Sequence, residues 1–354
     1  MARTIDSCVQ QWAVDVGKMK DHVPDKWHRR LAVKSKIQDP ISGTLMPSIP
    51  WYHDFWGEDA SGDETTYEDA QHYRSPEAMD RALADRGVDT ALLTSHEMRF
   101  LPAIPSPDYS AALASAYNEV VASDWLPVSD RFVGSVVVST SNPEAAAAEV
   151  RKYADNPDMV TVLVYGGGEL PLGHRSYDPL YEAAAEADMP LTIHVSGNPI
   201  HRQTAMGIPE QYVTHDTNLV HNHMTNMVSM LFQGVFDRYP DLDIVYAGQG
   251  VSWVLQTLWR STRYYRNLED TVPVHLEREP IEYLETNCYV TTYPLGVLPD
   301  ETAVSLFDMV GFDRILYGSG YPYWNADTVE DLPELDDEQR EQVLAKNASR
   351  VYGL

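Results

Sequence analysis

Lysine is scarce in this sequence of 354 residues, and acidic residues outnumber basic ones. After Lys36 the only lysines are Lys152 and Lys346, and 26 lysine and arginine residues stand against 53 acidic ones. The formal net charge of −27 repels nucleic acids and anionic membrane surfaces, so we expect neither as a partner. Acidic residues with so little lysine resemble the solvated surface of a protein from a halophile, and an ordinary acidic protein is the alternative.

Cysteine and long apolar segments are equally scarce. The two cysteines, Cys8 and Cys288, both lie in apolar strand-like runs, which argues against a structural disulfide. No run approaches the ~20 apolar residues of a membrane span. The opening MARTIDSCVQQW lacks the continuous apolar segment of a signal peptide. We therefore expect a soluble protein of the cytoplasm.

Short apolar runs alternate with helix-like segments along most of the chain. Ser75–Pro76 and Asn142–Pro143 each form an N-cap and first-turn pair that marks the start of a helix. The alternation predicts a (β/α)₈ TIM barrel, formed by a single domain over residues 1–354. The eight expected strands are 4–9, 88–94, 132–139, 159–165, the run at 189–198, 242–247, 288–292 and 314–317.

The segment 12–75 interrupts this pattern as a long insertion after the first strand. It is rich in proline, tryptophan and acidic residues and has no clean periodicity. Such long loops are usually either functional or disordered. The aromatic residues between Trp51 and Trp56 argue against disorder, because they would expose an unusual apolar patch to water. We predict an ordered lid that packs over the barrel mouth or a neighbouring subunit.

His194 ends the apolar run MPLTIHVSGN and is the centre of the predicted site. A histidine at the carboxyl end of a barrel strand points into the mouth, where active sites are built. A core histidine that bonds a backbone carbonyl is the alternative. Polar residues near other strand ends are predicted to bind the substrate, and Arg99 and Arg202 would suit a carboxylate unless they form surface ion pairs. The other members of this set are Gln10, His96, Tyr165, His201, Gln249, Thr292, Tyr321 and Trp324.

The order of landmarks resembles the amidohydrolase-related family, in the branch that includes aminocarboxymuconate semialdehyde decarboxylase. The landmarks are TIDSCVQ, MPLTIHVSG, GVFDRYPDLDIVYAGQGVSW, FDRILYGSGYPYW and LAKNASRVYGL, which together span nearly the whole chain. The resemblance implies a metal-dependent barrel enzyme. Its ligands would be His-x-His after the first strand, one histidine after the fifth, another after the sixth and an aspartate after the eighth.

Of these implied ligand positions, only His194 keeps its residue. Cys8 and Gln10 stand in place of His-x-His, Gly248 in place of the sixth-strand histidine, and Gly320 in place of the aspartate. A catalytic zinc needs three protein ligands and an open position for water. By the resemblance the aspartate would also move a proton, so its loss removes a general base as well. We predict no bound metal and no other cofactor.

Three further histidines, His215, His221 and His223, precede or begin a predicted helix over 216–238. His221 and His223 are two positions apart, so they lie about 200° apart around a helix and cannot share one face. At most one of them faces the barrel. Solvent-facing or capping histidines are the favoured interpretation.

Cys8 and His194 form the predicted catalytic pair, because the resemblance brings both to one metal position. Without a metal, the histidine could lower the thiol pKa and the pair could act as nucleophile and base. A small buried filler is the alternative interpretation of Cys8. Two functions stay open. One is a metal-independent enzyme that hydrolyses or decarboxylates a small carboxylated or aromatic substrate. The other is a catalytically degenerate barrel that serves an active paralogue as a subunit or ligand-binding partner. Either would assemble as a homo-oligomer or with the paralogous subunit.

Overall fold

The computed structural model describes residues 3–11, 16–28, 75–196 and 212–354, except 273, 297 and 324. The predicted insertion 12–75 falls largely outside these residues, and so do the aromatics on which the lid prediction rests. The part that is described contains helix α1 (Val16–His22), where the sequence shows no clean periodicity.

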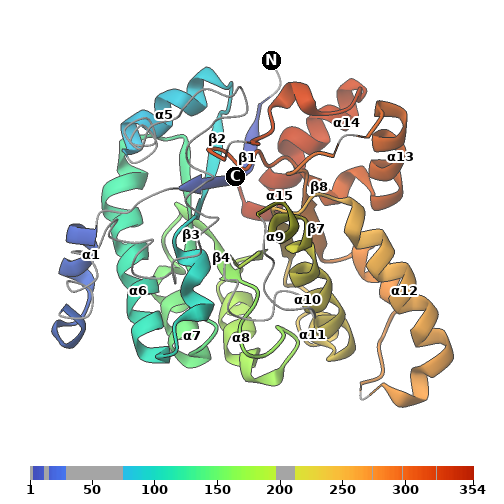
Figure 1. The fold of residues 1–354 in the computed structure, drawn as a ribbon, viewed down its shortest axis with the longest axis horizontal. Coiled ribbons are helices and arrows are strands. Elements are labelled where there is room, and N and C mark those ends of the chain that lie inside the picture. Colours follow the sequence, from blue (N-terminus) through green and yellow to red (C-terminus); the bar gives the residue numbers. More distant parts are fainter. Residues whose placement is uncertain are drawn as a thin grey trace.

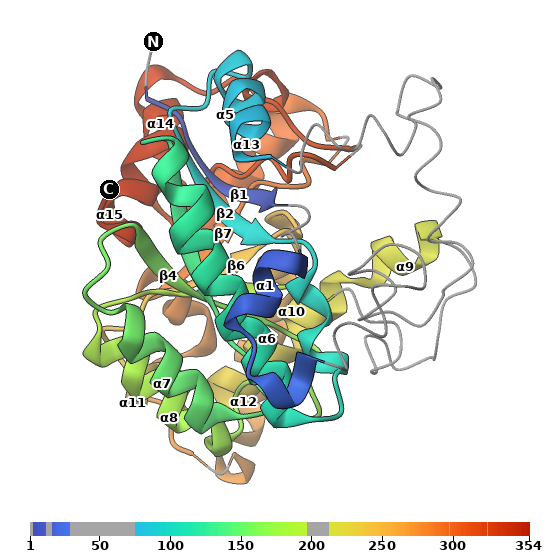
Figure 2. The ribbon, with the colours of Figure 1, turned by 90° about the vertical axis from the view of Figure 1, so that its left-hand side faces the viewer.

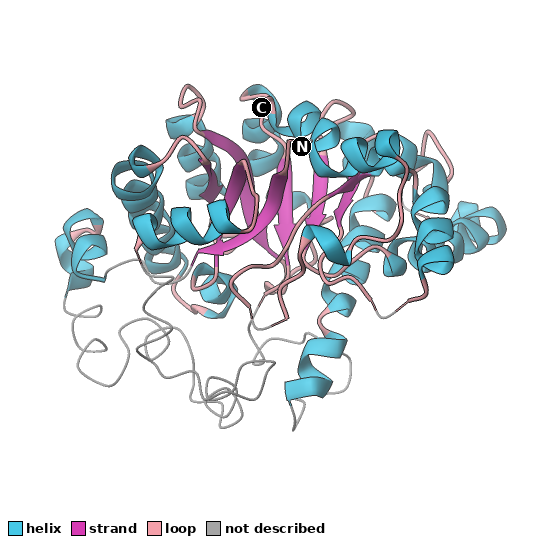
Figure 3. Cartoon of the chain, turned by 90° about the horizontal axis from the view of Figure 1, so that it is seen from above, coloured by secondary structure: helices cyan, strands magenta, loops and turns pink. Residues whose placement is uncertain are grey.

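Eight parallel strands form one sheet in the order β1 to β8, and helices surround it (Figures 1 and 3). The segment after β8 returns to β1: the Ser7 amide donates to the Tyr317 carbonyl at 2.8 Å, and the Gly320 amide to the Cys8 carbonyl at 2.9 Å. These bonds bring the last strand to the first, so the predicted (β/α)₈ barrel is confirmed. The strands are β1 (Ile5–Gln11), β2 (Thr90–Ser95), β3 (Phe132–Val137), β4 (Met159–Tyr165), β5 (Leu191–His194), β6 (Ile244–Ala247), β7 (Cys288–Thr291) and β8 (Ile315–Leu316).

The predicted helix starts are confirmed by their capping bonds. The Ser75 side chain accepts from the Ala78 amide, and the Asn142 side chain from the Ala145 amide. The helices between the strands are α5 (Pro76–Asp85), α6 (Pro107–Val120), α7 (Pro143–Tyr153), α8 (Asp178–Glu186), α10 (Val220–Phe232), α12 (Ser252–Leu268) and α13 (Asp300–Val310). Within the described part of the chain, no helix is long and apolar enough to cross a membrane.

One predicted long helix is in fact divided, and another contains a π-helical turn. The segment 216–238 holds the end of α9 (Tyr212–Asn218), then α10 and α11 (Val235–Arg238), and α9 stands away from the barrel body in Figure 2. The final helix is α14 (Asp337–Glu341), a π-helical turn over Gln342–Lys346, and α15 (Asn347–Tyr352). The turn at Gln342–Lys346 lets the Tyr317 amide donate to the Val343 carbonyl at 2.9 Å, which joins this segment to the end of β8.

The buried apolar residues form two clusters. The larger one lies between the strands and the surrounding helices. The smaller one joins strand residues such as Ile5, Leu92 and Leu316 to Ala348, Val351 and Tyr352 of α15. The Asn347 side chain donates to the carbonyls of Phe312 and Ile315 at 2.7 and 2.6 Å and fixes α15 there. Since Ile5 and Leu92 lie early in their strands, α15 forms the floor of the barrel, opposite the mouth.

Candidate functional site

The carboxyl ends of β1, β2, β4 and β5 gather the predicted polar residues on one side of the barrel. Tyr165 pairs with His194 in register, and their rings lie 5.9 Å apart at an edge-on angle of 61°. Gln10 pairs with Thr94 of β2, one residue before Ser95 and two before His96. The register of the parallel strands therefore brings these side chains to the mouth.

His194 is buried and hydrogen-bonded through both ring nitrogens. Its Nδ1 lies 3.0 Å from the Val195 carbonyl, which can only accept, so Nδ1 carries the proton. Nε2 is then the acceptor, and the Gln10 side-chain amide donates to it at 2.7 Å. Burial lowers the pKa of His194 to about 4, and the positive charge of Arg99 acts in the same direction. The imidazole is neutral at pH 7.

Cys8 is fully buried, and its sulfur contacts the Gln10 side chain. The second amide hydrogen of Gln10 points to Cys8 Sγ at 3.5 Å, so Gln10 bridges Cys8 and His194. Cys8 and His194 therefore both lie against Gln10, and their role as a catalytic pair stays a prediction. The predicted lowering of the thiol pKa is wrong, because burial, together with the charge of Asp6, raises it to about 12.

Asp6 is a buried carboxyl of β1 that was not among the predicted site residues. One carboxyl oxygen accepts from the amides of Cys8 and Ser319, at 3.0 and 2.9 Å. Burial raises the pKa of Asp6. The register of β1 against β2 shifts between Asp6 and Val9, so simple alternation along the strand does not place Asp6. Its bonds tie the segment after β8 to β1.

A second cluster lies just after β2, around Arg99. Arg99 is buried, and its guanidinium contacts the hydroxyl of Tyr323 and lies 5.8 Å from the centre of the Tyr323 ring. The same hydroxyl lies 2.8 Å from His96 Nδ1. Burial and the nearby His194 lower the pKa of His96 to about 3. Tyr323 was not predicted, although it stands two positions after Tyr321 in the GSGYPYW landmark.

The other predicted binding residues divide into three groups. Thr292 is engaged in the barrel wall, since its hydroxyl accepts from the Gly318 amide and donates to the Gly318 carbonyl. The Tyr321 ring lies 4.7 Å below the guanidinium of Arg86, and Gln249 is half-buried at the end of β6. His201, Arg202 and Trp324 lie outside the described residues.

The three further histidines take different positions. His221 is exposed and His223 fully buried, so the prediction that they occupy opposite faces is confirmed. His223 Nε2 bonds the Ala247 carbonyl at 3.0 Å, and its ring packs on Tyr246 and Trp253, so the favoured interpretation of a solvent-facing or capping histidine is wrong for His223. Burial and the charge of Arg99 lower the pKa of His215 to about 4, which places His215 near the Arg99 cluster.

Two glycines shape the space around His194 and β8. Gly248 has φ +86°, and a Cβ added there would lie 2.7 Å from His194 Nε2. Gly320 has φ +71°, and a Cβ added there would lie 2.4 to 2.5 Å from three atoms of the Tyr293 ring. The Tyr293 hydroxyl donates to the Asn325 side chain at 2.8 Å, which fixes the ring. Neither position has room for a side chain in this arrangement.

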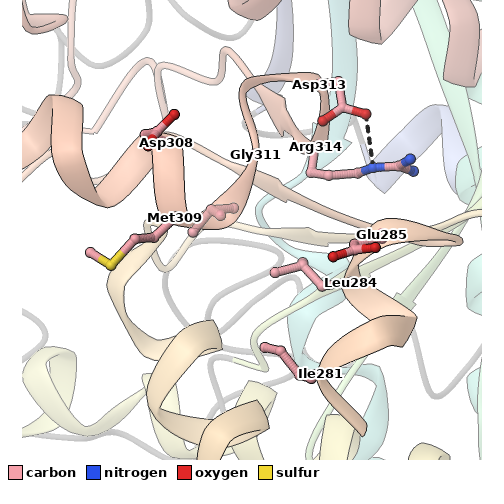
Figure 4. A pocket seen from close by; sticks show the side chains of 9 residues that line it. Ile281, Leu284, Glu285, Asp308, Met309, Gly311, Asp313 and Arg314 are labelled. Carbon is pink, nitrogen blue, oxygen red and sulfur yellow. Dashed lines mark ion pairs between the residues drawn. The ribbon is translucent and has the colours of Figure 1, made fainter. Parts of the chain in front are cut away.

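A surface pocket of about 400 Å³ lies elsewhere, between α13 and the 3₁₀ turn Pro280–Glu285 (Figure 4). Ile281, Leu284 and Met309 line it, and the Arg314 guanidinium pairs with Asp313 at 3.2 Å. Arg314 precedes β8 and Glu285 precedes β7, so this pocket lies at the end of the barrel opposite the mouth. It is not part of the candidate site.

Comparison with known protein families assigns the chain to a family. A family profile described as Amidohydrolase matches residues 22–354. The chain belongs to the amidohydrolase family. The resemblance read from the sequence is thereby confirmed at the level of the family.

Relatives in this amidohydrolase family include decarboxylases. The chain is 24% identical to a gamma-resorcylate decarboxylase of Rhodococcus jostii over 292 residues, which is 77% of this chain and 86% of the relative. A solved amidohydrolase from Mycobacterium avium subsp. paratuberculosis superposes with TM-score 0.75 at 21% identity, over 99% of both chains. A dihydroxybenzoic acid decarboxylase from Polaromonas sp. JS666, solved with manganese and 2-nitroresorcinol, gives TM-score 0.68 at 18% identity, over 100% of this chain and 98% of that one. These structures share the fold.

The described residues of this amidohydrolase do not fit a catalytic metal ion. The side-chain nitrogen that Gln10 turns to His194 is an N–H donor and has no lone pair to offer a cation. Outside residues 1–2, 12–15, 29–74 and 197–211, and the three single positions left out, no group of three or more His, Cys, Asp or Glu side chains could hold one. The implied loss of the metal ligands is consistent with this geometry and stays a prediction.

Proposed function

We propose that this amidohydrolase binds a small aromatic carboxylate at the barrel mouth and removes its carboxyl group without a bound metal ion. The observation that carries the proposal is the buried guanidinium of Arg99. Its charge acts on the pKa of His194, His215 and Tyr323, so the guanidinium lies close to the polar side chains gathered at the barrel mouth. Relatives that act on dihydroxybenzoic acids support this class of substrate.

Arg99 would serve binding more than the chemical step. A guanidinium pairs with a carboxylate through charge-assisted hydrogen bonds, and the buried setting strengthens that attraction. In decarboxylation the bond between ring and carboxyl carbon breaks, its electron pair stays on the ring, and a proton is taken up there as CO₂ leaves. The carboxylate charge therefore disappears along the reaction, and an interaction with it stabilises the bound substrate most. Glu97 and Asp216 also act on Tyr323, so Arg99 has acidic neighbours as well.

The direct test is an assay with 2,6-dihydroxybenzoate on protein treated with a chelator, following CO₂ release and the resorcinol product. Arg99→Met should raise KM by roughly 10- to 150-fold with a smaller effect on kcat, because a buried charged hydrogen bond contributes about 1.5–3 kcal/mol. Arg151→Met is the control, since its half-exposed guanidinium pairs with Glu186 on the surface. Turnover that appears only after manganese or zinc is added would refute the metal-free reaction.

A second candidate function is a non-catalytic barrel that binds the ligand for an active paralogue. The raised thiol pKa and the hydrogen-bonded His194 favour it, because neither group is ready as a nucleophile or base. Calorimetry would then show 2,6-dihydroxybenzoate binding that depends on Arg99, with no product formed over long incubation. Either function fits the expected oligomer, whose subunit number and composition light scattering on protein purified from its source would establish.

A further inference from the structure

The Gln10 side chain occupies the place between two potential metal donors. Its amide nitrogen lies 2.7 Å from His194 Nε2 and 3.5 Å from Cys8 Sγ. Because Nδ1 of His194 carries the proton, the lone pair of Nε2 points at this amide. The soft sulfur and the imidazole lone pair are thus both turned toward one hydrogen-bond donor.

The position of Gln10 is fixed by the barrel wall. Its backbone amide donates to the Tyr321 carbonyl at 2.7 Å, and its side chain is fully buried. The amide oxygen has no hydrogen-bond partner among the described residues. A buried polar atom without a partner destabilises the fold, by about 1–3 kcal/mol. Packing alone does not require an amide at this position, because a hydrophobic side chain of similar size would bury no unpaired oxygen.

We propose that Gln10 is the residue that keeps divalent metal ions out of the barrel centre, and that Cys8 and His194 are two thirds of a latent zinc site. Zinc binds thiolate and imidazole ligands and needs three from the protein. Gln10 supplies an N–H in the third position and repels a cation there. The inference bears on the metal-free part of the proposed function and is independent of the substrate.

The latent site is narrow, which sets its metal preference. The Tyr293 ring covers Gly320, and Gly248 lies against His194, so neither of these two positions can add a ligand side chain. A thiolate with two imidazoles in a confined tetrahedral arrangement suits zinc or cobalt. Manganese prefers oxygen ligands in an octahedron. We therefore expect a restored site to select zinc and cobalt over manganese.

The test is the variant Gln10→His, compared with wild type and with the double variant Gln10→His/His194→Ala. After dialysis against zinc, wild type should retain none at this site and Gln10→His about one ion per chain, since the third ligand is supplied. The double variant should retain none. Cobalt should give Gln10→His a thiolate charge-transfer band and tetrahedral visible bands, both lost in Gln10→His/Cys8→Ser.

Two results would overturn the inference. One is a zinc ion bound at His194 of wild type, and the other is a folded Gln10→His that binds none. If Gln10→His fails to fold, imidazole nitrogen NMR of wild type decides: a hydrogen-bonded Nε2 unmoved by zinc supports the inference, and a zinc-shifted Nε2 refutes it. A failed decarboxylation assay would leave these metal results unchanged, so the two proposals can fail separately.

Discussion

Gly320→Ala and Gly87→Ala are a matched pair of substitutions that measures how tightly Tyr293 fills the space beside β8. Both glycines have left-handed φ angles, +71° and +70°. A Cβ at Gly320 would lie 2.4 Å from the Tyr293 ring, whereas one at Gly87 would have no atom within 4 Å. Both substitutions therefore introduce the same backbone strain, and only Gly320→Ala adds a steric overlap with the Tyr293 ring.

The backbone strain of an L residue at this φ is roughly 1 kcal/mol, and overpacking adds about 1–3 kcal/mol. We expect Gly87→Ala to lower the free energy of unfolding by roughly 1 kcal/mol and Gly320→Ala by roughly 2–4 kcal/mol. Urea unfolding followed by tryptophan fluorescence measures both, through the shift of the midpoint at constant slope.

A double-mutant cycle isolates the steric overlap between the new methyl group at position 320 and the Tyr293 ring. In a Tyr293→Ala background the ring is gone, so Gly320→Ala should destabilise no more than Gly87→Ala does. Equal losses from Gly320→Ala with and without the ring would refute the reasoning. In that case the space at Gly320 is open, and a carboxylate could enter it more easily than the structure indicates.

Three further outcomes are expected. Cys8 should react with iodoacetamide only after unfolding, at a rate matching Cys288, because burial raises both thiol pKa values; fast labelling of native Cys8 would restore the nucleophile hypothesis. The free energy of unfolding should fall as the pH drops from 6.5 through about 4, because folding lowers the pKa of His194. For His194 alone the expected loss is roughly 3 kcal/mol. Unfolding midpoints measured from pH 8 to 4 test this expectation. Burial raises the pKa of Asp327 to about 7, so the ionisation of this carboxyl destabilises the fold increasingly from pH 4 to 7. Asp327→Asn should therefore stabilise the protein at pH 8 and lose that advantage near pH 4. An equal effect at both pH values would contradict the reasoning.

Local patterns in the sequence were sufficient for the strands and many helix starts. The apolar run Met159–Tyr165 is a strand with those same bounds, and Ser75 and Asn142 cap helices as their residue types predict. Such features depend on neighbours in the chain. The breaks in the helix over 216–238 and the π-helical turn before α15 depend on contacts with other elements, which periodicity does not record.

The site was predictable in its position and not in its electrostatics. Cys8, Gln10 and His194 meet because strand ends converge at a barrel mouth. The pKa of Cys8 depends on how completely the packed barrel excludes water, and the sequence pattern holds no measure of that. The contact of Tyr293 with Gly320 joins two loops that follow different strands, so no spacing rule could find it.

The floor formed by α15 also fixes an order of events during synthesis. Ala348, Val351 and Tyr352 follow all eight strands in the chain, yet they cover side chains of β1 and β2 that leave the ribosome first. Ile5 and Leu92 must therefore wait for nearly the whole domain to be translated before their final apolar partners exist. Until then the lower rim of the nascent barrel is an exposed apolar ring, open to chaperones and to wrong association.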